Sequence, residues 1–257
     1  MRNKVALVTG AAGGIGAAVV RALAERGAVV AAVDRNADAL RETVAKLVAE
    51  GGSRIEAFPA DVTDSAAVDA LVDTVERDLG PVDHLVNAAG VLRLGTVGSL
   101  TDEDWRATFA VNVDGVFHLS RAVVARMVPR RRGALVTVAS NAASTPRAEM
   151  AAYAASKAAA TMFTKSLGLE VAEYGIRCNV VAPGSTDTPM LSSMWHDASG
   201  PKGTIEGRPE AYRVGIPLGK LAQPADIAAA VLFLLSDQAG HITLHDLTVD
   251  GGAGLGA

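Results

Sequence analysis

The sequence contains a single cysteine, Cys178, and no apolar run long enough to span a membrane. One cysteine cannot form an intrachain disulfide, which fits a protein that works in a reducing compartment. A spanning helix needs about 18 apolar residues in a row, and the run at 227–235 (IAAAVLFLL) is only half that length. The amino terminus, MRNKVALVTG, leads into a strand pattern without the layout of a signal peptide. We therefore expect a cytoplasmic protein with no membrane partner.

The chain also lacks an excess of positive charge and a metal-binding pattern. Its net charge is −4, and the only basic cluster, 130–132 (RRR), is expected to be a solvated turn, so we predict no nucleic-acid partner. His241 and His245 would lie about 13 Å apart in an extended segment, too far to share one metal ion. The other histidines form no ligand spacing, so we predict no metal. Cys178, in an apolar strand pattern, is expected to be a buried thiol.

Strand-like apolar segments alternate with helical patterns along almost the whole chain. The strand-like segments are 5–9, 28–34, 54–60, 83–90, 134–140, 177–183 and 244–250. This alternation predicts βαβ units and a parallel sheet covered by helices on both faces. No linker or change of composition divides the chain, so we expect one domain, 1–257, with an irregular lid at about 184–212.

A glycine-rich turn follows the first predicted strand and leads into a helix. Glycines at 10, 14 and 16 allow a tight turn and a close approach of a ligand, and the helix amino terminus offers free N–H groups to a pyrophosphate. The second strand ends at Asp34, whose carboxylate can accept hydrogen bonds from both ribose hydroxyls and would repel a 2′-phosphate. This favours NAD over NADP, although the neighbouring Arg35 can hold a 2′-phosphate.

Polar or small residues also follow the third and fourth strands, at Asp61-Val62 and at 87–90 (NAAG). Carboxyl ends of strands are where doubly wound sheets bind ligands. Taken alone, such residues are most often caps or turns.

Tyr153 and Lys157 are four positions apart in the helical pattern AAYAASK, so they share one helix face. A nearby cation favours the phenolate, which would make Tyr153 a better base near neutral pH. By spacing alone, a surface pair is the commoner explanation. Ser140 closes the fifth strand and can hydrogen-bond a substrate oxygen beside the phenol, and Asn112 can hold a water that connects Lys157 to solvent.

Six features recur in order and at matching spacing in one known family: 9–16 (TGAAGGIG), 87–90 (NAAG), Asn112, Ser140, 153–157 (YAASK) and Pro183-Gly184. In combination they resemble the short-chain dehydrogenase/reductase family. The resemblance implies a Rossmann-type, doubly wound sheet of seven mostly parallel strands with helices on both faces. It also implies a homotetramer whose interface includes the carboxyl-terminal region.

The same resemblance implies a role for each candidate catalytic residue. Tyr153 is the acid/base, Lys157 binds the nicotinamide ribose and lowers the tyrosine pKa, Ser140 orients the substrate, and Asn112 supports a proton relay. The predicted NAD-binding residues are Gly10, Gly14, Ile15, Gly16, Asp34, Asp61, Val62, Asn87, Ala88, Gly90, Tyr153, Lys157, Pro183, Gly184, Thr186 and Thr188.

Within this family, several longer stretches resemble the 2,3-dihydro-2,3-dihydroxybenzoate dehydrogenases of catecholate siderophore biosynthesis. They include VNAAGVLRLG, VTVASNAASTPRAEMAAYAASKAA and IRCNVVAPGSTDTPM. This resemblance implies NAD-dependent oxidation of the C3 hydroxyl of a cyclohexadiene carboxylate, followed by tautomerisation to 2,3-dihydroxybenzoate. The same residues fit 2,3-dihydro-3-hydroxyanthranilate or another alcohol or ketoacyl substrate. A dinucleotide-binding regulator without activity is the remaining alternative, but it would not need all four catalytic residues.

A carboxylate substrate requires a cation in the site, and two arginines follow strands near the predicted chemistry. Arg93 and Arg147 are the candidates, because a guanidinium binds a carboxylate with two parallel hydrogen bonds. Ser140, Met150 and Tyr153 complete the predicted substrate contacts. The lid around Trp195 and His196 does not match the related enzymes residue by residue, so its contacts stay open.

Overall fold

Segments rich in Val, Ala, Ile and Leu form a seven-stranded sheet in which neighbouring strands are parallel, as the sequence predicted. The strand order is β3-β2-β1-β4-β5-β6-β7. The strands are β1 Val5–Thr9, β2 Val29–Asp34, β3 Ile55–Pro59, β4 Val82–Asn87, β5 Gly133–Val138, β6 Ile176–Pro183 and β7 Asp246–Val249. The computed structural model describes residues 1–51, 54–195 and 197–256, so residues 52–53, 196 and 257 of the predicted domain and lid lie outside the described residues.

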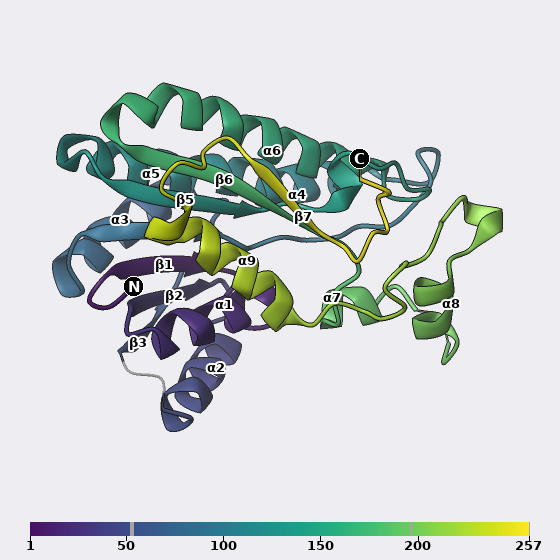
Figure 1. Ribbon diagram of the computed structural model, residues 1–257, viewed down its shortest axis with the longest axis horizontal. Coiled ribbons are helices and arrows are strands. Elements are labelled where there is room, and N and C mark those ends of the chain that lie inside the picture. Colours follow the sequence, from purple (N-terminus) through teal and green to yellow (C-terminus); the bar gives the residue numbers. More distant parts are fainter. Residues whose placement is uncertain (52–53, 196, 257) are drawn as a thin grey trace.

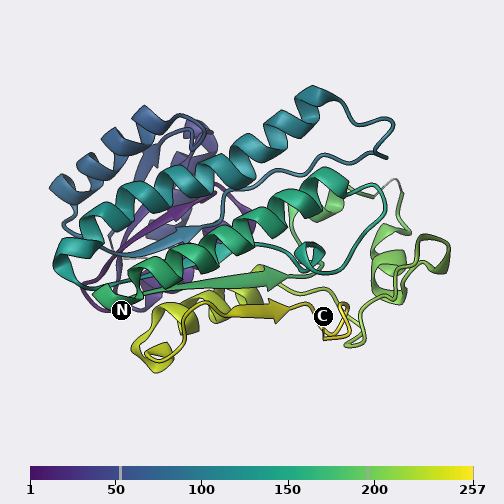
Figure 2. The ribbon, with the colours of Figure 1, turned by 90° about the horizontal axis from the view of Figure 1, so that it is seen from above.

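Helices cover both faces of this sheet (Figure 1). Helices α1, α2 and α9 pack on one face, and α3, α5 and α6 lie side by side on the other (Figure 2). The helices are α1 Gly14–Glu25, α2 Ala37–Ala49, α3 Ser65–Asp78, α4 Asp102–Phe109, α5 Gly115–Arg130, α6 Ala151–Val171, α7 Pro189–Ser192, α8 Gly200–Glu206 and α9 Pro224–Leu235. Within the described part of the chain, none of them has the length and hydropathy needed to cross a bilayer.

Side chains of each strand alternate between two apolar layers. In β1, Ala6 and Val8 pack with residues of α1 and α9, whereas Val5 and Leu7 pack with residues of α3 and α5. Successive side chains of a strand point to opposite faces, and here both faces are covered, so the strand is buried throughout. Cys178 of β6 is a fully buried thiol, as expected, and burial raises its pKa to about 12.

The strand order reverses at β1, which pairs with β2 on one side and with β4 on the other. Connections on the two sides of such a reversal lead to opposite faces of the sheet and leave a crevice at the carboxyl ends of the strands. The segments that follow β1, β4, β5 and β6 therefore meet at one edge, where the predicted site residues lie.

The structure shows an irregular turn at Asn112 and differs from the sequence expectation at the lid. Asn112 is buried in one π-helical turn, η1 (Ala110–Asp114), which joins α4 to α5. The lid at 184–212 was predicted to be irregular, but it contains α7, α8 and the 3₁₀ turn η4 (Pro209–Ala211). Short helices that start at a Pro or Gly have little periodicity to reveal them in the sequence.

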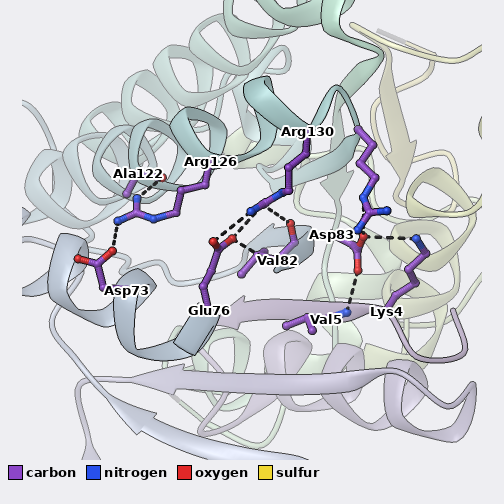
Figure 3. A network of polar contacts seen from close by, with 10 residues as sticks. Lys4, Val5, Asp73, Glu76, Val82, Asp83, Ala122, Arg126 and Arg130 are labelled. Carbon is purple, nitrogen blue, oxygen red and sulfur yellow. Dashed lines mark hydrogen bonds and ion pairs between the residues drawn. The ribbon is translucent and has the colours of Figure 1, made fainter. Parts of the chain in front are cut away.

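Arg130 anchors a polar network at the amino-terminal edge of the sheet (Figure 3). Its guanidinium donates to both carboxylate oxygens of Glu76, at 3.0 and 2.9 Å, and to the Val82 carbonyl at 3.1 Å. Glu76 also accepts from the Val82 N–H at 3.0 Å. The expectation of a solvated turn at 130–132 is wrong for Arg130, because α5 extends to this residue and directs its side chain onto α3.

We predict that Glu76→Gln destabilises the protein, because a neutral amide cannot accept all of these hydrogen bonds. The expected loss in the free energy of unfolding, measured by urea denaturation, is about 1–3 kcal/mol. The control is Asp78→Asn, which removes the exposed Arg77–Asp78 ion pair and should leave the midpoint unchanged. Equal effects of the two substitutions would show that the network adds no stability.

Candidate active site

Two adjoining pockets lie at the carboxyl ends of the strands. The first, here called the groove, runs from the β1–α1 turn past Asp34 and Asp61 to Gly90. The second, here called the inner pocket, contains Ser140, Tyr153 and the segment after β6. The two pockets share the residues Ile15, Ala88, Gly90, Thr188 and Met190. A single extended ligand can therefore reach from the groove into the inner pocket.

The β1–α1 turn requires glycine where two backbone segments approach each other. Gly10 has φ +68°, and a Cβ on it would lie 2.8 Å from the Ala88 carbonyl oxygen. A Cβ on Gly16 would overlap the Gly10 carbonyl oxygen. Gly13, by contrast, faces open space in the groove at the amino terminus of α1. Free N–H groups at this helix end suit a pyrophosphate.

Asp34 stands at the far end of the groove, at the end of β2. Its carboxylate accepts hydrogen bonds from the Ala12 N–H at 3.2 Å and the Asn36 N–H at 3.0 Å. A carboxylate held in this way keeps lone pairs for a ribose diol. Together with the glycine turn, it gives the groove the polar groups that fit a dinucleotide. Arg35 also lines the groove beside Asp34.

The Thr9 hydroxyl, which belongs to the first residue of the 9–16 motif and had no predicted role, joins the ends of β1 and β4. Its oxygen accepts hydrogen bonds from the N–H groups of Ala88 and Ala89, both at 3.1 Å. Its signal in the sequence was a hydroxyl residue directly before the first glycine of the turn. Asn87, predicted to bind NAD, lines neither pocket; its amide donates to Ser120 at 3.1 Å and Thr137 at 3.4 Å.

Tyr153, Lys157 and Ser140 meet in the inner pocket, where all three side chains are buried. Helix α6 places the Lys157 ammonium 5.7 Å from the centre of the Tyr153 ring. The ammonium donates a hydrogen bond to the Val138 carbonyl at 3.0 Å. Ser140, two residues after the end of β5, lies beside the Tyr153 side chain and favours its phenolate form. The geometry suits a proton transfer at the phenol oxygen.

Burial shifts the pKa values of the two titratable groups in opposite directions. It lowers the pKa of Lys157 to about 8 and raises the pKa of Tyr153, and Ser140 opposes only the tyrosine shift. Desolvation of the phenol is the larger effect in the protein alone, so the pKa of Tyr153 lies above its ordinary value, and the lowering of that pKa by Lys157 stays a prediction. An additional positive charge in the pocket would favour the phenolate.

Asn112 fixes the loop that follows β4. Its side-chain oxygen accepts from the Val91 N–H at 2.9 Å, and its amide donates to the Val91 carbonyl and to Ser156, both at 3.0 Å. A Cβ on Gly90 would lie 3.3 Å from the Lys157 nitrogen and 3.4 Å from the Asn112 oxygen, so the two side chains converge there. With these contacts Asn112 is a positioning residue, and its part in a proton relay stays a prediction.

The remaining predicted residues divide between the two pockets and the surface. Those that line at least one pocket are Gly10, Gly14, Ile15, Gly16, Asp34, Asp61, Val62, Ala88, Gly90, Arg147, Met150, Pro183, Gly184, Thr186 and Thr188. Arg93 lines neither; its side chain is 55% exposed and lies 3.8 Å from Asp104. Arg213, which the sequence analysis did not select, lines the inner pocket from the lid. In the sequence, Arg213 is only a charged residue in an irregular stretch, and periodicity does not predict where such a stretch places its side chains.

No cluster of three or more His, Cys, Asp or Glu side chains suited to a metal ion occurs in residues 1–51, 54–195 and 197–256. The polar groups of the two pockets are instead amides, hydroxyls, carboxylates and cations suited to an organic ligand.

Comparison with known proteins gives the following relationships. Residues 4–199 match the family described as "short chain dehydrogenase". The chain is 60% identical over 256 residues to a 2,3-dihydro-2,3-dihydroxybenzoate dehydrogenase of Bacillus subtilis (strain 168), covering 100% of this chain and 98% of that protein. It is 46% identical over 250 residues to a protein of the same name from Escherichia coli (strain K12), covering 97% and 96%. A solved short-chain type dehydrogenase/reductase from Mycobacterium marinum has a TM-score of 0.88 at 30% identity, covering 98% of this chain and 96% of that one.

We predict that Lys157→Met changes how stability depends on pH. The lysine pKa falls from 10.5 in the unfolded chain to about 8 in the folded protein. Between these values the unfolded chain binds the extra proton, so this group makes the wild-type protein more stable as pH rises through that window. Methionine does not titrate, so the stability of the variant relative to wild type should fall by up to about 3 kcal/mol across it.

The measurement is urea denaturation of both proteins, without ligands, at several pH values from below 8 to above 10.5. Lys202→Met, which removes an exposed lysine of α8, is the control and should track wild type. Parallel pH profiles for wild type and Lys157→Met would contradict the prediction.

Proposed function

This chain belongs to the short-chain dehydrogenase family, oxidoreductases that use a nicotinamide dinucleotide, and on that premise we propose that it oxidises 2,3-dihydro-2,3-dihydroxybenzoate with NAD. The products are 2,3-dihydroxybenzoate and NADH. The observation that carries this proposal is that the inner pocket combines Tyr153, Lys157 and Ser140 with a cation, Arg147. The pocket thus offers partners for both the reacting hydroxyl and the carboxylate of such a substrate. The names of the Bacillus subtilis and Escherichia coli relatives support the same substrate.

The residues of the inner pocket divide the work of the reaction. Ser140 hydrogen-bonds the C3 hydroxyl and holds it toward the Tyr153 oxygen. Tyr153, as phenolate, accepts the hydroxyl proton as C3 becomes a carbonyl carbon. The oxidised nicotinamide, when bound, supplies the hydride acceptor and a positive charge beside the phenol. Lys157 adds a second positive charge and offers further N–H groups to the ribose, since only one of its three is used by Val138.

The loss of one proton from oxygen and one hydride from C3 leaves a ring ketone. Tautomerisation of that ketone moves a ring proton to the oxygen and gives the aromatic catechol. Aromaticity makes this last step strongly favourable. Conversion of the ketone to the aromatic product is therefore expected to shift the equilibrium of the oxidation toward NADH and product.

We propose NAD rather than NADP as the cofactor because of Asp34. Its carboxylate lines the groove at the end of β2 and would repel a 2′-phosphate at the same place where it binds the ribose hydroxyls. The neighbouring Arg35 would favour NADP, because its guanidinium can bind a 2′-phosphate. It lies beside the Asp34 carboxylate, however, and that carboxylate still lines the groove.

We also propose that residues 1–257 act as one cytoplasmic domain and assemble as a homotetramer. The exposed apolar side chains of α5 and α6 support the assembly: Phe117 is 40% exposed, Met162 63% and Leu169 72%. A second copy of the chain would cover these side chains. The single free, buried cysteine suits a reducing compartment.

Tyr153→Phe tests the proposed reaction. The variant keeps the ring but cannot accept the proton, so kcat for 2,3-dihydro-2,3-dihydroxybenzoate should fall by about 100- to 10,000-fold. The assay follows NADH formation by its absorbance, and NADH fluorescence titration should show that cofactor binding is retained.

Tyr174→Phe is the matched control, because Tyr174 lies beside Arg131, outside both pockets. Its turnover should equal that of wild type. Unchanged turnover in Tyr153→Phe would overturn the proposed mechanism. Turnover of 2,3-dihydro-3-hydroxyanthranilate, with none of the diol, would keep the mechanism and change the substrate.

Asp34→Asn tests the cofactor. Replacing the carboxylate weakens charge-assisted hydrogen bonds to the ribose, so KM for NAD should rise by about 10- to 100-fold with little change in kcat. The ratio of kcat/KM for NADP to that for NAD should increase. Asp38→Asn, at an exposed position of α2, is the control and should leave both values unchanged. A wild-type enzyme that prefers NADP would contradict the cofactor proposal.

A further inference from the structure

Two arginines from separate loops face the inner pocket. Arg147 lies between η2 (Asn141–Ala143) and α6, next to the catalytic groups of β5 and α6. Arg213 lies more than sixty positions later, in the lid between η4 and α9. Burial lowers the pKa values of both guanidiniums. Charge repulsion from Arg147 and from Arg208 lowers the pKa of Arg213 further, so Arg147 lies near it.

Backbone hydrogen bonds within the lid loop fix the main chain at Arg213. The backbones of Arg208 and Arg213 exchange two hydrogen bonds, at 2.9 and 3.0 Å. Below them, the Ile216 N–H donates to the Ile205 carbonyl at 2.8 Å. A Cβ on Gly207 would lie 2.6 Å from the Arg213 carbonyl oxygen, so glycine is needed for the two arms to approach. The backbone at Arg213 is therefore held from both sides.

Within residues 1–51, 54–195 and 197–256, neither Arg147 nor Arg213 forms a side-chain hydrogen bond or an ion pair with another residue. Asp250 attracts Arg147, but its carboxylate already accepts from Asn141, Gly252 and Gly254. Arg208, the third arginine nearby, is paired with Glu210 at 2.9 Å.

Two partly buried like charges without partners are unfavourable unless an anion joins them. The two arginines both line the inner pocket with Tyr153 and Ser140 and do not line the groove, so an anion that joins them there would be part of the substrate. We propose that Arg213 and Arg147 bind the substrate carboxylate together and make the enzyme selective for a cyclohexadiene acid over the same diol without a carboxylate. The identity of this acid rests on the function proposed above.

The paired site has a structural consequence. Each guanidinium presents parallel N–H donors, so one carboxylate can accept from both arginines with its two oxygens. The bound carboxylate then links the lid to the β5–α6 loop. A substrate that lacks this group makes neither link. Selectivity therefore depends on the lid, whereas proton transfer depends on β5 and α6.

The test compares 2,3-dihydro-2,3-dihydroxybenzoate with cyclohexa-3,5-diene-1,2-diol, which carries the same diol and no carboxylate. The quantity measured is the ratio of kcat/KM for the acid to that for the uncharged diol. Arg213→Met should lower this ratio by about 10- to 100-fold, the cost of losing charge-assisted hydrogen bonds. Arg213→Lys, which keeps the charge without the fork, should fall between Arg213→Met and wild type.

Arg208→Met is the matched control. It removes a guanidinium from the same loop, but one that is paired with Glu210 and does not line the inner pocket. Its ratio should equal that of wild type. A fall in activity toward both substrates to the same extent in Arg213→Met would overturn the proposal, because it would indicate damage to the lid. An unchanged ratio would overturn it as well.

Measuring the binding of the two aromatic products tests the arginine pair independently of the proposed function. Isothermal titration with 2,3-dihydroxybenzoate and with catechol measures the carboxylate preference without any turnover. Wild type should prefer the acid, and Arg213→Met should lose that preference. If wild type oxidised neither diol but Arg213→Met still lost the preference, the proposed function would fail and the arginine pair would stand. If wild type bound neither product, or both equally, the pair would be overturned.

Discussion

The site depends on the close contact between the ends of β1 and β4. There the Thr9 hydroxyl accepts hydrogen bonds from two successive backbone N–H groups, at Ala88 and Ala89. The Gly10 backbone packs so closely on Ala88 that no side chain fits between them. This contact lies at the crevice created by the reversal of strand order. It also aligns the helix end that suits a pyrophosphate with the loop at Gly90, where Lys157 and Asn112 converge.

Burial in this crevice shifts the pKa values of the catalytic groups Tyr153 and Lys157. A lysine inside the protein holds its proton less tightly, and a tyrosine gives up its proton less readily, because both charged forms are poorly solvated. Each group in the protein alone therefore favours its neutral form more than it would in water. A positive charge on a ligand bound in this pocket would favour the phenolate. Such an arrangement would link the ability to accept a proton to the presence of the oxidised cofactor.

The sequence predicted the parts of the molecule that depend on short-range regularity. Strand alternation gave the sheet, and helical spacing placed Tyr153 and Lys157 on one face of α6. Positions set by the path of long loops were not predictable from periodicity. Arg93 and Arg213 each follow a glycine-rich or irregular stretch, and only the second reaches the inner pocket. Arg130 was missed for a different reason, because its partner Glu76 lies 54 positions away.

The division between regular elements and loops also separates reaction type from substrate choice. Ser140 lies two residues after β5, and Tyr153 and Lys157 lie in α6, so the sheet and its covering helix fix their positions. The two arginines proposed to bind the substrate anion lie on loops outside the sheet and its covering helices. A change at Arg147 or Arg213 is therefore expected to alter which alcohol is accepted while the proton-transfer geometry persists. The same catalytic residues can serve many substrates in this fold, because the selective contacts come from segments that the sheet does not constrain.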